Sequence, residues 1–101
     1  MNETAKFVRN NQVLQLQGRV NIKTVNGLFR TFRRELVPGI EDLDCSGIQE
    51  CDSTVISLLL ACLRMARKQN ISLHIKGMNQ QLLSLARLYD VETMLQTTVD
   101  S

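Results

Sequence analysis

Two short strands are predicted near the N-terminus, and part of the second alternates apolar with polar residues, the pattern of a half-buried β-strand. Residues 7–9 form the first stretch and residues 13–18 the second. Asn10 and Asn11 stand between them, and asparagine tolerates the left-handed backbone that tight turns require. We therefore predict an N-terminal β-hairpin.

The apolar spacing changes to a helical period from Thr24 to about Leu36, and Thr24 is the expected cap. One face of this predicted helix is apolar and carries Val25, Leu28, Phe29 and Phe32. The other face is basic and carries Arg30, Arg33 and Arg34. A solvated helix face is favoured over lipid or acidic-partner contact as the interpretation of this basic stripe.

Pro38 and Gly39 interrupt the chain before the next apolar segment. We predict a short strand over residues 40–44, with Asp44 at its polar end. The residues that follow, Cys45-Ser46-Gly47, are predicted to form a loop.

The longest helix is predicted to begin at Asp52 or Ser53 and to end at Lys68 or Gln69, with Asn70 closing it. At 100° per residue, its inward stripe is centred on Val55, Leu59, Cys62 and Ala66, with Leu58, Leu63 and Met65 at the margins. The outward arc carries Thr54, Ser57, Ala61, Arg64 and Lys68. Ile56 and Leu60 lie at the border between the two faces. This extra apolar surface could allow copies of the isolated chain to associate.

The remaining pattern predicts a strand over residues 71–76, a helix capped by Asn79 and running to Leu88, and a short helix over residues 91–95. Residues 96–101 are polar and are expected to fray. Strands that alternate with helices favour an α/β fold with parallel neighbours. We expect one domain over residues 1–101, with a mixed, mostly parallel sheet of four to five strands and helices packed against it.

Composition narrows the classes of function. Apolar residues make up 44% of the 101 residues and charged residues 22%, the balance of an ordinary globular protein. A net charge of +2 and four aromatic residues argue against a nucleic-acid surface. Three cysteines and one histidine support neither a disulfide framework nor a metal site, and no cofactor is expected. The N-terminal residues contain no apolar signal region, and no run suffices to span a membrane, so a cytoplasmic protein is expected.

The triplet Asp52-Ser53-Thr54 stands directly before the apolar run of the long helix. Asp52 or Ser53 can accept a hydrogen bond from a free N–H group of the first turn. Capping explains one of these polar residues well and three of them less well. The small side chains of the outward arc would also let another surface approach the backbone closely. Both interpretations, a cap and a contact, are retained.

The stretch "LDCSGIQECDSTVISLLLACLRMARKQNISLHIKG", residues 43–77, resembles the STAS domain, the fold of anti-sigma-factor antagonists and of sulfate-transporter tails. In that family a strand ends in Asp, and Asp-Ser-Ser-Gly or Asp-Thr-Gly-Gly opens a helix after a short loop. Leu43-Asp44 looks like the strand end, and Asp52-Ser53-Thr54 looks like the helix opening. Val55 stands where the family has glycine. Within the family, "ARKQ" at 66–69 and "LARLY" at 85–89 are similar to the STAS subunits of Mla-type phospholipid transporters.

This resemblance implies a non-catalytic subunit at the inner face of the inner membrane. It would bind and regulate the ATPase subunit of an Mla-type ABC transporter that also contains permease and substrate-binding subunits, and that maintains outer-membrane lipid asymmetry. The implied partner-binding residues are Asp52, Ser53, Thr54, Ser57, Ala61 and Arg64. Direct membrane insertion is not implied.

The alternative implied by the same family is a partner switch controlled by phosphorylation. Thr54 matches the phosphorylated hydroxyl of the regulatory members, and Ser53 matches the functional hydroxyl of the transporter subunits. An enzyme is disfavoured, because neither Gly-x-x-x-x-Gly-Lys nor Gly-x-Gly-x-x-Gly occurs and the only histidine, His74, lies in a predicted strand.

Overall fold

The computed structural model describes residues 4–96, which form four strands and four helices in the predicted order. In chain order the elements are β1 (Ala5–Asn10), β2 (Val13–Val20), α1 (Val25–Glu35), β3 (Asp42–Cys51), α2 (Thr54–Lys68), β4 (His74–Lys76), α3 (Gln80–Leu88) and α4 (Glu92–Gln96). The polar tail predicted to fray falls mostly on residues 97–101, outside the described residues.

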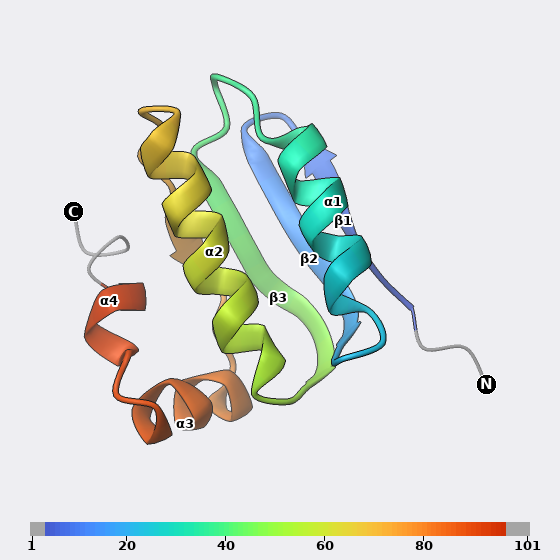
Figure 1. The fold of residues 1–101 in the computed structure, drawn as a ribbon, viewed down its shortest axis with the longest axis vertical. Coiled ribbons are helices and arrows are strands. Elements are labelled where there is room, and N and C mark those ends of the chain that lie inside the picture. The colour runs from blue at the N-terminus through green and yellow to red at the C-terminus, as the bar shows by residue number, and fades with distance from the viewer. Residues whose placement is uncertain (1–3, 97–101) are drawn as a thin grey trace.

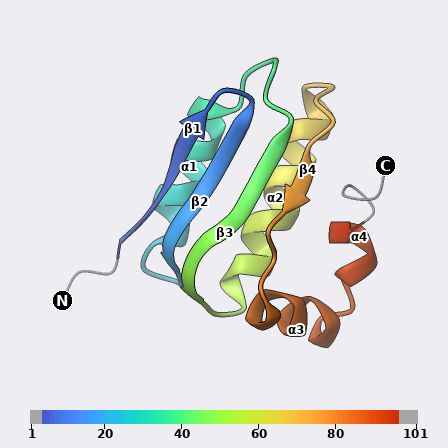
Figure 2. The ribbon, with the colours of Figure 1, turned by 180° about the vertical axis from the view of Figure 1, so that it is seen from behind.

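The strands form one sheet in the order β1-β2-β3-β4, in which β1 is antiparallel to β2 and the other pairs are parallel. Helices α1 and α2 lie side by side on one face of this sheet (Figure 1), and no described helix covers the other face (Figure 2). Helix α3 lies at the end of the sheet where α2 begins, and α4 lies beside α2 on the side away from α1. The mixed, mostly parallel α/β fold is confirmed.

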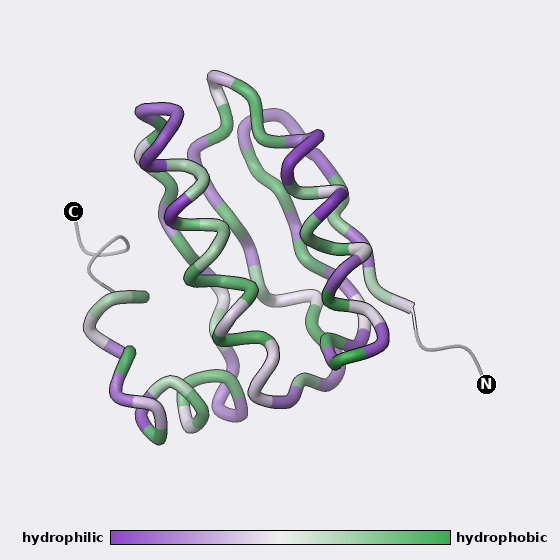
Figure 3. The backbone as a smooth tube through the Cα atoms, viewed as in Figure 1, coloured by the Kyte–Doolittle hydropathy of each residue, from purple (hydrophilic) through white to green (hydrophobic). Residues whose placement is uncertain are grey.

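The core fills the space between the sheet and the pair of helices. Phe32 of α1 is fully buried, and its ring centroid lies 5.4 Å from that of Phe7 on β1. Helix α2 contributes more buried side chains than α1, namely Val55, Ile56, Leu58, Leu59, Cys62 and Ala66. In Figure 3, α2 becomes hydrophilic toward its C-terminal end, where Arg67 and Lys68 complement the negative end of the helix dipole.

Strand β3 differs from the prediction, because it continues through the residues that were expected to form a loop. It runs without a break from Asp42 to Cys51, so Asp44 lies inside the strand and not at its end. Register shifts opposite Gln15/Gln17 and Gly18/Arg19 break the regular alternation. Its buried residues are therefore Leu43, Cys45, Ile48 and Cys51. Buried residues are two positions apart up to Cys45 and three positions apart after it. The alternation that predicts a strand is therefore absent from the second half of β3.

Two of the three predicted turn and cap residues, Asn79 and Asn70, have the predicted role, and Thr24 does not. Asn79 caps α3, and its Oδ1 accepts a hydrogen bond from the Leu82 N–H at 2.9 Å. Asn70 closes α2 in the left-handed conformation, with φ of 60°. Thr24 precedes α1 as predicted, but its hydroxyl donates to the Arg19 carbonyl at 2.7 Å instead of capping the helix. The last strand is shorter than expected, because β4 pairs with only three residues of β3.

Candidate functional site

The junction between β3 and α2 carries the candidate site. Strand β3 ends at Cys51, and the Asp52 backbone N–H donates to the Val20 carbonyl of β2 at 3.1 Å. The Asp52 carbonyl in turn accepts from the Val55 N–H at 3.0 Å in the first turn of α2. The backbone at Asp52 is therefore held by both the sheet and the helix, which fixes the position of the neighbouring side chains.

The side chain of Asp52 is the cap of α2. Its Oδ1 accepts from the Thr54 N–H at 2.9 Å and from the Thr54 hydroxyl at 2.5 Å. Ser53 already has helical dihedral angles, φ of −63° and ψ of −16°, and its side chain makes no capping bond. The structure thus separates the two hydroxyls. Thr54 is half-buried and bonded to Asp52, whereas Ser53 is exposed and its hydroxyl has no hydrogen-bond partner among residues 4–96.

The outward arc of α2 matches its prediction. Ser57 and Arg64 are exposed and Ala61 is half-buried, while the inward stripe from Val55 to Ala66 is buried. At the border, Ile56 is 6% exposed and belongs to the core, so it adds none of the surface that self-association was expected to use. Leu60 is half-buried and retains part of that surface. The arc offers small side chains near Ser53 and a guanidinium further along the helix.

A shallow open depression of about 540 Å³ adjoins Asp52 on the side of the β2–α1 connection. Ile22 and Lys23 line it together with Glu50 and Gln81. Ile22 is 72% exposed, which is unusual for an isoleucine and places an apolar side chain next to the polar end of α2. Ile22 was not predicted from the sequence as a site residue. The available signal was an aliphatic residue between Asn21 and Lys23, in a segment otherwise suited to a turn.

The three thiols are poor candidates for chemistry. Burial, with smaller contributions from Asp44 and Cys51, raises the pKa of Cys45 to about 12. Burial and then Asp52 raise the pKa of Cys51, and burial and then Cys45 raise that of Cys62 well above the usual thiol value. Cys51 ends β3 beside the candidate site, whereas Cys45 lies earlier in the same strand. All three remain protonated at neutral pH and pack as small apolar side chains.

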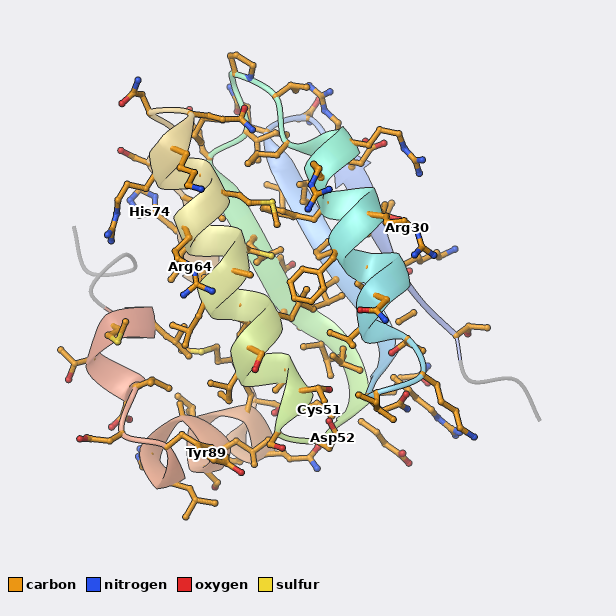
Figure 4. The ribbon with its side chains drawn as sticks, viewed as in Figure 1. Arg30, Cys51, Asp52, Arg64, His74 and Tyr89 are labelled. Carbon is orange, nitrogen blue, oxygen red and sulfur yellow. The ribbon has the colours of Figure 1, made fainter. Side chains whose placement is uncertain are left out.

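His74 lies far from the hydroxyls of Ser53 and Thr54. It lies on β4 beside the start of β3, where its Nδ1 is 3.9 Å from Asp42 Oδ1. Asp52 follows the other end of the same ten-residue strand, about 30 Å away at the usual rise per residue. Figure 4 shows His74 and Asp52 at opposite ends of the molecule. Within the described range, no group of three His, Cys, Asp or Glu side chains could hold a metal ion.

Among the residues described, no helix is both long enough and apolar enough to cross a membrane.

Comparison with known proteins places this chain in a family. The chain is 29% identical over 91 residues to the intermembrane phospholipid transport system binding protein MlaB of Escherichia coli (strain K12), covering 90% of this chain and 93% of that protein. The MlaB protein of Shigella flexneri matches with the same identity and coverage. A family profile described as "Mlab, STAS domain" matches residues 4–97. A four-stranded sheet of mixed strand direction with two helices on one face agrees with that assignment. The chain therefore belongs to the MlaB-type STAS-domain family.

Proposed function

We propose that this protein is a non-catalytic subunit of an Mla-type phospholipid ABC transporter, and that it binds the ATPase subunit through the N-terminal end and outward arc of α2. The contact face consists of Asp52, Ser53, Thr54, Ser57, Ala61 and Arg64. The names of its relatives, which describe a binding protein of an intermembrane phospholipid transport system, support this assignment.

The observation that carries the proposal is the exposed Ser53 hydroxyl, which has no partner within the described chain although it stands beside a capped helix end. A hydroxyl can both donate and accept, so it suits a partner surface that supplies one group of each kind. Ser57 and Ala61 follow at helical spacing, and their small side chains let a partner helix or loop approach the α2 backbone. Ile22 adds an apolar anchor beside this polar centre.

The protein would act on the ATPase without performing chemistry. A bound subunit shifts a conformational equilibrium only by the difference between its affinities for the two states. The contact face would therefore stabilise one arrangement of the ATPase. Because one face of α2 is already buried against the sheet, little ordering cost would oppose binding. The transporter, with its permease and substrate-binding subunits, would hold this chain at the inner face of the inner membrane.

The proposal is tested by capture of the ATPase from the native cells with tagged protein, comparing wild type with Ser53→Glu. We expect wild type to retain an ABC ATPase, identified by mass spectrometry, and Ser53→Glu to lose it. The substituted carboxylate would stand beside Asp52 and would be unpaired at the interface. Ser84→Glu is the matched control, because Ser84 is exposed on α3 and lies outside the contact face.

Circular dichroism would establish that each variant is folded. Loss of the ATPase with Ser53→Glu but not with Ser84→Glu supports the contact face. Equal retention by both variants would move the contact away from Ser53. Absence of an ABC ATPase from the wild-type capture would refute the function itself.

A phosphorylation switch is the second candidate function, and one observation favours it in a revised form. Ser53 is the exposed hydroxyl, whereas Thr54 is half-buried and bonded to Asp52. Phosphate on Ser53 would add close to two negative charges at the N-terminus of α2, which tolerates them, and would repel a partner fitted to a hydroxyl. A phosphorylated form at Ser53 and a captured kinase-like protein would support this candidate over the transporter subunit.

A further inference from the structure

A groove lies beside the proposed contact face, between the C-terminal half of α2, the segment leading into β4, and α4. Its volume is about 750 Å³, within the range of sites that hold a peptide segment or a small molecule. Leu60 and Leu63 of α2, Ile71 before β4 and Met94 of α4 supply its apolar lining. Met94 is 55% exposed, so α4 presents a large apolar side chain to solvent at this groove.

The groove is also cationic. Arg64 and Arg67 line it, and both are exposed. Neither arginine forms an ion pair with any residue in the range 4–96, whereas Arg87 is paired with Glu92 at 3.0 Å. No Asp or Glu side chain is among the residues that line the groove. Two unpaired guanidiniums beside an apolar lining are complementary to carboxylates that flank an aliphatic side chain.

The groove is continuous with the contact face, because Arg64 belongs to both. Figure 4 shows Arg64 and His74 on the side of α2 that faces away from α1, the side on which α4 lies. A partner seated on the outward arc of α2 would therefore stand close to the groove. The apolar lining and the unpaired charges favour an extended or helical segment of that partner over a small neutral ligand.

We propose that this groove is a second contact site, which receives an acidic segment of the same ATPase partner with an aliphatic side chain between its carboxylates. This inference rests on the proposed function for the identity of the partner. The recognition chemistry rests on Arg64, Arg67 and the apolar lining alone. Two separate contacts on one chain would hold the ATPase in a defined orientation and would slow its dissociation.

The test uses Arg67→Glu, which alters the groove and spares the proposed contact face. Arg9→Glu on β1 is the matched control, because it makes the same change of charge at an exposed arginine remote from the groove. With the purified ATPase, we expect Arg67→Glu to weaken the affinity about tenfold or more, since a lost pair becomes a repulsive one. Arg9→Glu should change the affinity less than twofold. Equal effects of the two variants would overturn the inference.

A photo-reactive side chain at position 94 identifies the occupant. The expected cross-link is to a segment of the ATPase rich in Asp and Glu, and replacing one of its carboxylates by lysine should restore the affinity of Arg67→Glu. A cross-link to a segment without acidic residues would overturn the inference while leaving the proposed function standing.

A peptide probe separates the two proposals. A fluorescent peptide of alternating glutamate and leucine pairs should bind the isolated chain, and its glutamine analogue and Arg67→Glu should abolish that binding. If the peptide binds in this way but no ATPase binds the chain, the proposed function is wrong, and the proposed recognition of acidic segments by the groove is supported. Arg67-dependent binding to anionic vesicles but not to the peptide would make a lipid the occupant. Peptide binding only after removal of residues 97–101 would make the chain's own tail the occupant. Either result would overturn the inference.

Discussion

Replacing Asp52 by alanine tests how the candidate site is built. The structure assigns the cap of α2 to Asp52, whose Oδ1 accepts two hydrogen bonds from Thr54, and assigns no capping bond to Ser53. Loss of an Asp cap costs about 0.5–2 kcal/mol of stability. Loss of the carboxylate at the helix N-terminus accounts for about 0.3–1 kcal/mol of such effects at exposed sites. We therefore expect Asp52→Ala to lower the free energy of unfolding by about 1–2 kcal/mol.

Two companion variants separate the contributions. Asp52→Asn keeps an acceptor oxygen and removes the charge, so it should cost about 0.3–1 kcal/mol. Ser53→Ala should change stability by less than about 0.5 kcal/mol, because its backbone is already helical and its hydroxyl makes no bond to lose. Urea denaturation measures all three, with an unchanged slope showing that the unfolded states are comparable.

The refuting result is a loss of stability with Ser53→Ala that equals or exceeds the loss with Asp52→Ala. If Ser53→Ala cost as much as Asp52→Ala, Ser53 would be the cap and its hydroxyl would not be available to a partner. The proposed contact would then lose its central group. A small effect of Ser53→Ala on stability, together with loss of ATPase capture by Ser53→Glu, would assign Ser53 to binding and Asp52 to folding.

Two further predictions concern the scaffold. Gly47→Ala should destabilise the protein by about 1–3 kcal/mol, because the added Cβ would lie 2.9 Å from the Leu16 carbonyl oxygen. Gly27→Ala in α1 should stabilise it by about 0.5–1 kcal/mol, because the nearest atom to the added Cβ is 3.9 Å away. Thermal unfolding measures both changes, and destabilisation by both would contradict the packing described. Above pH 9 an unfolded Cys45 thiol loses its proton while the folded one, with a pKa of about 12, keeps it, so the unfolded state binds fewer protons and stability falls as pH rises. That slope should reach about 1.4 kcal/mol per pH unit from Cys45 alone, and urea titrations between pH 8 and 10.5 should show a shallower slope for Cys45→Ala; identical slopes would refute the assignment.

The sequence by itself determined the order of the elements, the inward and outward faces of α2, and the cap at Asn79. These features depend on residues close together in the chain, so spacing and local hydrogen bonding carry the information. The resemblance of residues 43–77 to the STAS domain implied the fold and the candidate site at Asp52, Ser53 and Thr54. The family assignment by comparison agrees with that resemblance.

Only the tertiary structure decided the extent of β3 and the separate roles of the two hydroxyls. The strand continues past Asp44 because the register shifts against β2 absorb its irregular spacing, and those shifts depend on a partner strand about 30 residues earlier in the chain. The Asp52 N–H donates to the Val20 carbonyl of β2, a contact that local sequence does not encode, at the point where Asp52 bonds Thr54 and Ser53 is exposed. Ile22 beside Asp52 and the cationic groove between α2 and α4 likewise arise from segments distant in sequence. Their surfaces exist only where the fold brings those segments together.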